Sequence, residues 1–119
     1  MANYFQTSTQ FYKEIRSSED EKSKAICFGV ISDFEELSKQ KALMAVTNKR
    51  VVYFWLNGKT KSGLAVDFGN ILSVTLFNND TEIILKTNSS VTMHLKHISR
   101  GNPADVVREI NEQREQGLA

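Results

Sequence analysis

ALMAVTNKRVVYFW, residues 42–55, holds two runs of apolar and β-branched residues on either side of the polar break Thr47-Asn48-Lys49-Arg50. Short runs of this kind, bounded by polar residues, are typical of neighbouring β-strands. We therefore predict strands over residues 41–46 and 51–55, joined by a turn. A second break, Asn57-Gly58, is the preferred dipeptide of a type I′ turn, because both central residues of that turn have positive φ. It predicts a hairpin into the next strand.

The same pattern fills most of the chain between residues 24 and 100. Apolar and β-branched runs alternate with short polar turns, which predicts further strands at 25–31, 63–68, 71–77, 81–86 and up to about residue 98. Because side chains alternate between the two faces of a strand, the runs at 63–68 and 71–77 each place one set of apolar residues on a single face. Those sets are Leu64, Val66 and Phe68, and Leu72, Val74 and Leu76, the second directed inward.

Both ends of the chain carry a helical pattern instead. Over residues 4–16 the large apolar and aromatic residues fall within an arc of about 120° on a helical wheel. They are Tyr4, Phe5, Phe11, Tyr12 and Ile15. After Gly101, Asn102 is a favourable N-cap and Pro103 suits the first helical position. The apolar stripe of this second helix consists of Val106, Val107 and Ile110.

These elements predict an α+β fold. A chain of 119 residues is long enough for a single hydrophobic core. We divide it into an N-terminal helix and polar linker at residues 1–23 and a sheet domain at 24–119, whose helix covers about 103–115. Seven antiparallel strands leave two exposed sheet edges. A strongly bent sheet, or open barrel, capped by the C-terminal helix solves that problem.

Particular residues in this order resemble those of a known family. Ala45-Val46-Thr47-Asn48-Lys49-Arg50-Val51-Val52-Tyr53, followed by Val66-Asp67-Phe68 and Ile71-Leu72-Ser73-Val74, is similar to the bacterial pleckstrin-homology-like domains, in particular the YokE-like group. Their fingerprint is an apolar run, a threonine, two polar residues, an arginine and an apolar-aromatic strand. The resemblance covers about residues 24–115. It implies a seven-stranded bent sheet capped by a C-terminal helix and no enzymatic activity, and it implies little about the ligand.

Composition narrows the classes of partner. The net charge is only +1, so the whole molecule has no strong attraction for nucleic acid or for a membrane. Cys27 is the only cysteine, which excludes an intramolecular disulfide and favours a buried thiol in a reducing compartment. The polar residues that follow Met1 do not resemble a signal peptide. We therefore expect a cytoplasmic protein that does not bind nucleic acid.

Several fragments imitate catalytic or metal-binding motifs without their context. Gly58-Lys59-Thr60 matches the end of a phosphate-binding loop, but no helix is predicted to follow it. Asp67-Phe68-Gly69 copies a kinase tripeptide in a chain far too short for a kinase. His94 and His97 stand three apart in a predicted strand, so their side chains project to opposite faces. We expect no enzyme, no cofactor and no metal.

The N-terminal helix is the first candidate for binding. If it were left undocked, Tyr4, Phe5, Phe11, Tyr12 and Ile15 would expose more apolar surface than a monomer normally tolerates. The stripe packs either on its own barrel or against another copy or another protein. The leading functional prediction is a non-enzymatic interaction module that binds protein, itself or a different chain.

The second candidate is the open end of the predicted barrel. Loops at 33–41, 55–61 and 86–90 are expected to meet there and to bring lysines together, while an aromatic and an aliphatic side chain at a hairpin tip reach an interface. The residues are Lys39, Lys41, Trp55, Leu56, Lys59 and Lys61. They predict, as an alternative function, a peripheral membrane adaptor for anionic lipid. The same lysines also suit solvated strand ends that discourage edge pairing.

Overall fold

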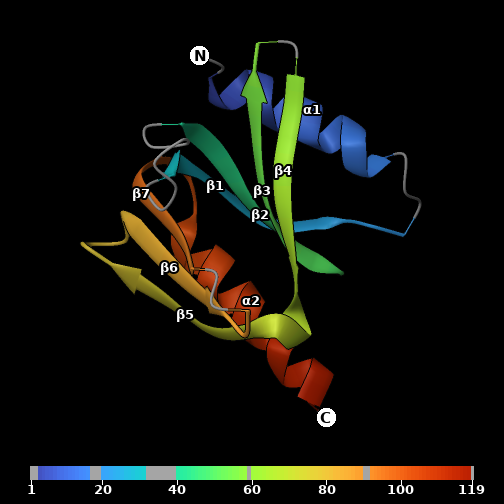
Figure 1. The fold of residues 1–119 in the computed structure, drawn as a ribbon, viewed down its shortest axis with the longest axis vertical. Helices are drawn as coiled ribbons and strands as arrows, with labels where there is room; N and C mark the ends of the chain where they lie inside the picture. Colours follow the sequence, from blue (N-terminus) through green and yellow to red (C-terminus); the bar gives the residue numbers. More distant parts are fainter. Residues whose placement is uncertain (1–2, 17–19, 32–39, 59, 90–91, 119) are drawn as a thin grey trace.

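The computed structural model of the protein describes residues 3–16, 20–31, 40–58, 60–89 and 92–118, with side chains as far as residue 115 (Figure 1). Its elements, in chain order, are α1 Tyr4–Arg16, β1 Ser23–Ile31, β2 Lys41–Thr47, β3 Arg50–Asn57, β4 Thr60–Asp67, the 3₁₀ turn η2 Phe68–Asn70, β5 Ile71–Phe77, β6 Glu82–Thr87, β7 Thr92–Gly101 and α2 Pro103–Leu118. The strands and both helices correspond to those predicted from the sequence.

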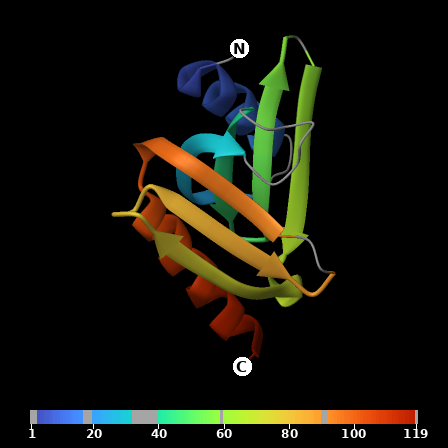
Figure 2. The same cartoon turned by 60° about the vertical axis from the view of Figure 1, so that its left-hand side comes forward.

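The described strands form one antiparallel sheet in the order β4-β3-β2-β1-β7-β6-β5. Two meanders, β1–β4 and β5–β7, are joined because β1 pairs with β7, where Cys27 lies opposite Gly101 and Ile31 opposite Leu95. The sheet bends so strongly that β5–β7 run across the direction of β3 and β4 (Figures 1 and 2). Strands β4 and β5 follow one another in the chain but form the two edges. The predicted open barrel is confirmed.

The inner face of the bent sheet holds the larger core, which α2 covers. Val106 and Ile110 of α2 are fully buried there, and α2 contacts β1, β2, β5, β6 and η2. Asn102 caps this helix as predicted: its Oδ1 accepts a hydrogen bond from the Asp105 N–H at 3.3 Å. The other large buried side chains of this core are Ile31, Met44, Tyr53, Trp55, Ile83, Leu85, Met93 and Leu95.

A second core lies on the outer face of the same sheet, under α1. Phe11 and Ile15 of the helix pack against apolar residues of β1, β2 and β3. Those strand residues are Phe28, Leu43, Ala45, Val52, Phe54 and Leu56. Because the odd-numbered side chains of β3 face α2 and the even-numbered ones face α1, both β2 and β3 are buried on their two faces.

A bulge in β7 and two glycines let β1 and β7 approach closely. His97 adopts φ 52° between two stretches of regular pairing, Phe28 with Arg100 and Val30 with Lys96. A Cβ built on Gly29 would lie 2.5 Å from the carbonyl oxygen of Lys96, and one on Gly101 would lie 2.3 Å from that of Ile26. Only glycine fits either position without a backbone shift.

Two local predictions are wrong by one residue. The β5 register shifts between Ile71 and Ser73, so Ile71 is buried and Leu72 is 58% exposed instead of directed inward. Asn57 is the last residue of β3 and pairs with Thr60, so the loop consists of positions 58 and 59. Gly58 has the positive φ, 64°, that a tight hairpin requires.

Candidate interaction surfaces

The Thr47–Arg50 turn, which carries the family fingerprint, holds the chain segment that precedes β1. The Arg50 guanidinium donates two hydrogen bonds to the carboxylate of Glu21, at 3.0 and 3.1 Å. The Thr47 hydroxyl donates to the same carboxylate at 2.7 Å and accepts from the backbone N–H of Arg50 at 3.1 Å. The Arg50 bonds, reinforced by the Thr47 bond, hold the pKa of Glu21 below its ordinary value although burial opposes this. All these polar groups satisfy one another, so the fingerprint serves stability.

Asn48 completes this attachment. Its Oδ1 accepts from the backbone N–H of Lys22 at 2.7 Å, and its Nδ2 donates to the carbonyl of Asp20 at 2.7 Å. Residues 17–23 were predicted to be a polar linker with nothing to bury, but Glu21 is buried. The prediction is wrong there because a carboxylate becomes easy to bury once an arginine and a threonine hydroxyl are both bonded to it.

The predicted partner-binding stripe of α1 is divided by its contact with the sheet. Phe11 is 2% exposed and Ile15 is also buried, while Tyr4 and Tyr12 are half-buried. Only Phe5 of this set is exposed, at 67%. The expectation that all five residues are available to a partner is wrong for Phe11 and Ile15, because the outer face of β1–β3 is itself apolar and covers them.

The predicted lipid-binding residues do not form one surface. Lys39 and Lys59 lie outside the described residues. Trp55 is 7% exposed and belongs to the inner core, and Leu56 is buried in the outer one, so neither projects from a hairpin tip as expected. Both were misplaced because β3 extends to Asn57 and is covered on both faces.

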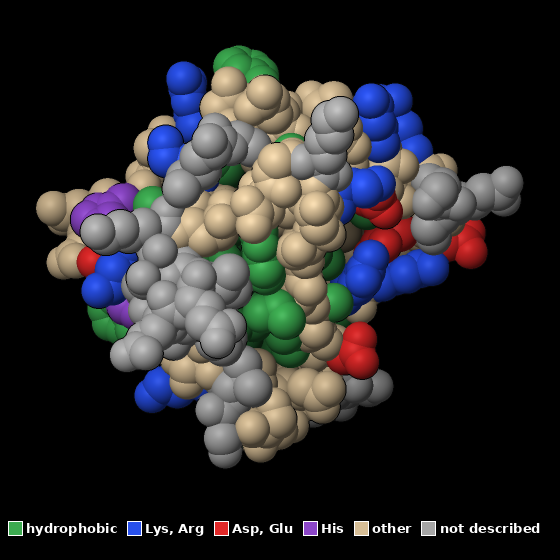
Figure 3. All heavy atoms as spheres, turned by 45° about the horizontal axis from the view of Figure 1, so that its top comes forward, with side chains coloured by type: hydrophobic (Ala, Val, Ile, Leu, Met, Phe, Trp, Pro, Cys, Tyr) green, Lys and Arg blue, Asp and Glu red, His purple; other side chains and the backbone are tan. Residues whose placement is uncertain are grey.

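The two described lysines of that set lie in different settings. Lys61 forms an ion pair with Glu14 that links β4 to α1. Lys41 is exposed. Figure 3 shows Lys and Arg side chains at separate margins of the face it presents, some beside Asp and Glu, with a strip of hydrophobic side chains between. Among the described residues, the cations on this face are therefore dispersed.

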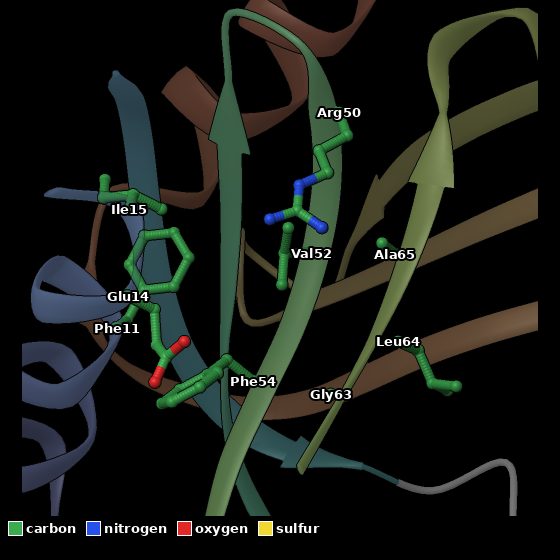
Figure 4. A pocket seen from close by; sticks show the side chains of 9 residues that line it. All are labelled: Phe11, Glu14, Ile15, Arg50, Val52, Phe54, Gly63, Leu64 and Ala65. Atoms are coloured by element: carbon green, nitrogen blue, oxygen red, sulfur yellow. The ribbon is translucent and has the colours of Figure 1, made fainter. Parts of the chain in front are cut away.

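A groove of about 200 Å³ separates α1 from the outer side of β3 and β4 (Figure 4). Phe11, Glu14 and Ile15 of α1 line one side, and Arg50, Val52, Phe54, Gly63 and Ala65 line the other, with Leu64 at the margin. The Glu14 carboxylate and the Arg50 guanidinium point into the groove, whereas the Leu64 side chain points away from it. Gly63 and Ala65 are small, so the floor of the groove stays open beside the sheet edge.

A second hollow, of about 310 Å³, lies at the first turn of α1. It is lined by Asn3, Tyr4, Phe5, Phe28, Lys41, Ser99 and Arg100. Burial raises the pKa of Tyr4, and so does neighbouring Tyr12, whereas Arg100 opposes the rise. Sequence reasoning did not find Arg100, because its proximity to α1 follows from the pairing of β7 with β1.

The two edges of the sheet differ in how they are protected. On β5 the register is broken at Leu72, and the carbonyl of that residue accepts a hydrogen bond from Arg114 of α2 at 2.8 Å. β4 instead keeps regular pairing with β3 through eight residues, Thr60 to Asp67. Most of its side chains are exposed, and Leu64 is 38% exposed. Sequence reasoning predicted this strand but could not identify it as an edge.

Other candidate chemistry is limited in the described part of the chain. Within it, no group of three or more His, Cys, Asp or Glu side chains is placed to hold a metal ion. None of its helices is long and apolar enough to cross a membrane. Cys27 is buried, and burial raises the pKa of its thiol to about 12, so the nucleophilic thiolate is suppressed.

Comparison with known proteins agrees with this architecture. The profile of the bacterial PH domain family matches residues 18–112. No curated protein matches the chain. The solved C-terminal domain of an unknown protein from Leishmania infantum is 11% identical, with a TM-score of 0.63 over 94% of this chain and 98% of that one. A DUF1696 family protein with a pleckstrin-homology domain, from Shewanella loihica PV-4, is 17% identical, with a TM-score of 0.57 over 96% of this chain and 99% of that one.

Proposed function

The chain belongs to the bacterial PH domain family, and we propose that it is a non-enzymatic interaction module that binds protein through the edge of β4. Membership supports a binding module in general, because PH-like domains are generally non-catalytic. One observation favours β4 as the site: it is a regular, exposed strand that ends the sheet order. An edge strand of this kind presents a row of backbone N–H and C=O groups to which an extended segment can add.

The groove between α1 and β4 supports the same site. A strand added beside β4 would place alternate side chains over the outer face, next to Gly63 and Ala65. These small residues leave room for larger side chains of the partner. The ion pair between Lys61 and Glu14 stands at one end of the groove, so a partner with a carboxylate near Lys61 is favoured.

The test compares two leucines on the two sheet edges. Leu64→Lys on β4 and Leu72→Lys on β5 introduce the same charge at exposed positions. Proteins captured from an extract of the host cells should be lost with Leu64→Lys and retained with Leu72→Lys. Capture of the same proteins by both variants would place the binding surface away from β4. Thermal melts of both variants confirm that each is folded.

A second candidate function, binding to an anionic lipid surface, is favoured by the hollow at the start of α1. Phe5 is 67% exposed there and shares the hollow with Lys41 and Arg100. An exposed aromatic beside two cations is suited to the headgroup region, where each cation contributes roughly 1 kcal/mol. This places the candidate lipid site away from Trp55 and Leu56.

Vesicle flotation tests this candidate at two salt concentrations. Binding to vesicles with anionic lipid should weaken at high salt and should be lost in Lys41→Glu plus Arg100→Glu. Lys86→Glu, an exposed lysine of β6 outside the hollow, is the matched control and should bind like the wild type. Absence of flotation at low salt would end the lipid hypothesis and leave the protein-binding one untouched.

A further inference from the structure

We infer that a second copy of this chain is a partner of the β4 edge, and that two β4 strands pair antiparallel about a two-fold axis with Leu64 opposite Leu64. The inference rests on the proposed function and identifies one occupant of its site. It joins two seven-stranded sheets into one. A two-fold interface of this kind uses the same surface on both copies, so β4 has to be complementary to itself.

The charges of β4 select this register. With Leu64 at the axis, Lys61 of each copy lies opposite Asp67 of the other, so the interface contains two such pairs. Moving the axis by half a residue in either direction places Lys61 opposite Val66 or Phe68 and leaves Asp67 without an opposite charge. Opposite charges directly across an antiparallel pair stabilise it, and like charges destabilise it.

Both charges lie on the same face of the strand, as the register requires. In the β3–β4 pairing Lys61 is opposite Leu56 and Asp67 is opposite Arg50, and Leu56 packs under α1 on the outer face. Lys61 already contacts Glu14 of α1, and the charge of Asp67 helps to raise the pKa of Arg50, after the larger effect of Glu21. Across the dimer the charges would therefore alternate as Glu14, Lys61, Asp67 and Arg50.

The remaining side chains of β4 fit close pairing. Gly63 would lie opposite Ala65 on the outer face, and Ser62 opposite Val66 on the inner face. Half-exposed Leu64 would meet its symmetry mate at the axis and lose its contact with water. The strand pairs with β3 without a bulge and contains no proline, so its free edge is straight enough to accept a partner.

The other edge lacks these features, which explains why β4 is chosen over β5. β5 has a register shift at Leu72 and gives that carbonyl to Arg114. Its hairpin to β6 also turns through three consecutive residues of positive φ, Asn78, Asn79 and Asp80. A partner strand at β5 would have to displace the arginine and follow the bulge.

Charge reversal gives a decisive test on the full-length chain. Lys61→Asp places two Asp–Asp pairs in the homodimer, and Asp67→Lys places two Lys–Lys pairs. Each variant alone should self-associate roughly tenfold more weakly than the wild type or worse, since two attractive pairs become repulsive. An equimolar mixture of the two restores both opposite-charge pairs and should form a heterodimer as readily as the wild type forms its homodimer.

Sedimentation velocity over a range of concentrations measures these states, with Lys86→Asp and Asp20→Lys as matched controls away from β4. Both controls are exposed and should dimerise like the wild type. A second measurement needs no variant: amide hydrogen exchange of residues 60–67 in the wild type should slow as the protein concentration rises, while that of residues 71–77 should not change.

Two outcomes would overturn the inference. One is a wild type that stays monomeric, with unchanged exchange in β4, at all concentrations. The other is a dimer that persists in both single charge variants or that mixing fails to restore. If the wild type is monomeric and the capture of other proteins still depends on Leu64, this inference fails and the proposed function stands. If Leu64→Lys changes neither self-association nor capture, both fail.

Discussion

The guanidinium of Arg50 grips the carboxylate of Glu21, 29 residues earlier in the chain, through two hydrogen bonds of 3.0 and 3.1 Å. Glu21 is buried, and the Thr47 hydroxyl bonds to the same group at 2.7 Å. This pair fastens the segment between α1 and β1 to the β2–β3 turn. It gives a physical reason for the threonine and the arginine of the fingerprint, because each supplies a donor to a carboxylate that would otherwise be costly to bury.

Removing the charge of Glu21 should destabilise the fold and change its response to acid. Glu21→Gln keeps the shape but weakens the bonds to Arg50, so we expect a loss of about 1–3 kcal/mol in urea unfolding at neutral pH. The folded pKa of Glu21 is lowered from 4.5, so its stabilisation is complete above that value and is lost as the pH falls through the folded pKa. The difference between the wild type and the variant should therefore shrink below about pH 4.5. A difference independent of pH would contradict this account.

Gly101 and Gly58 have similar backbone angles but should respond differently to alanine. Both have positive φ, 82° and 64°, which costs a residue with a Cβ about 1–2 kcal/mol. At Gly58 nothing lies within 4 Å of the added atom, so the cost should end there. At Gly101 the atom would lie 2.3 Å from the Ile26 carbonyl, and strain from overpacking of about 1–3 kcal/mol adds to it. Thermal melts of the two variants measure the contrast, and equal losses would refute it.

The docking of α1 on its own sheet predicts a clear difference between two phenylalanines. Phe11→Ala removes a side chain that is 2% exposed and should cost about 3–5 kcal/mol. Phe5→Ala removes one that is 67% exposed and should change stability by less than about 0.5 kcal/mol. Chemical denaturation of both variants checks this. Equal small effects would mean that α1 does not stabilise the domain in solution.

Trp55 should report a buried site by fluorescence, because it is the only tryptophan in the chain. It is 7% exposed inside the inner core, so its emission should be blue-shifted relative to that of the unfolded chain and weakly quenched by acrylamide. Anionic vesicles should leave the spectrum unchanged even if the protein binds them. A blue shift on addition of vesicles would restore Trp55 as a membrane contact.

Much of the fold could be predicted because its determinants are local. Alternation and turn residues predict the strands, and Asn102 with Pro103 predicts the start of α2, which the structure confirms. The pairing of β1 with β7 has no local signature. It depends on contacts between residues more than 60 positions apart, such as Cys27 with Gly101, and on a left-handed histidine in a bulge.

The candidate sites were harder to predict for the same reason. Trp55 and Leu56 carry the pattern of a strand end, and only the combined cover of α1 and α2 makes them core residues. Leu64 belongs to a predicted strand, but its exposure depends on which strands lie beside it in the finished sheet. Glu21 stands in a run of polar residues, and its burial depends on Arg50, a partner far along the chain. Each of these facts is a property of tertiary neighbours.

The burial of β2 and β3 on both faces also has a consequence for how the molecule ages and is degraded. Loss of α1 by proteolysis would not simply shorten the chain, since it would uncover a continuous hydrocarbon wall of Leu43, Ala45, Val52, Phe54 and Leu56. Such a wall on an otherwise intact sheet is a strong nucleus for precipitation. The first helix therefore acts as a solubilising cover, and the nicked protein should be far more prone to clump than the whole one.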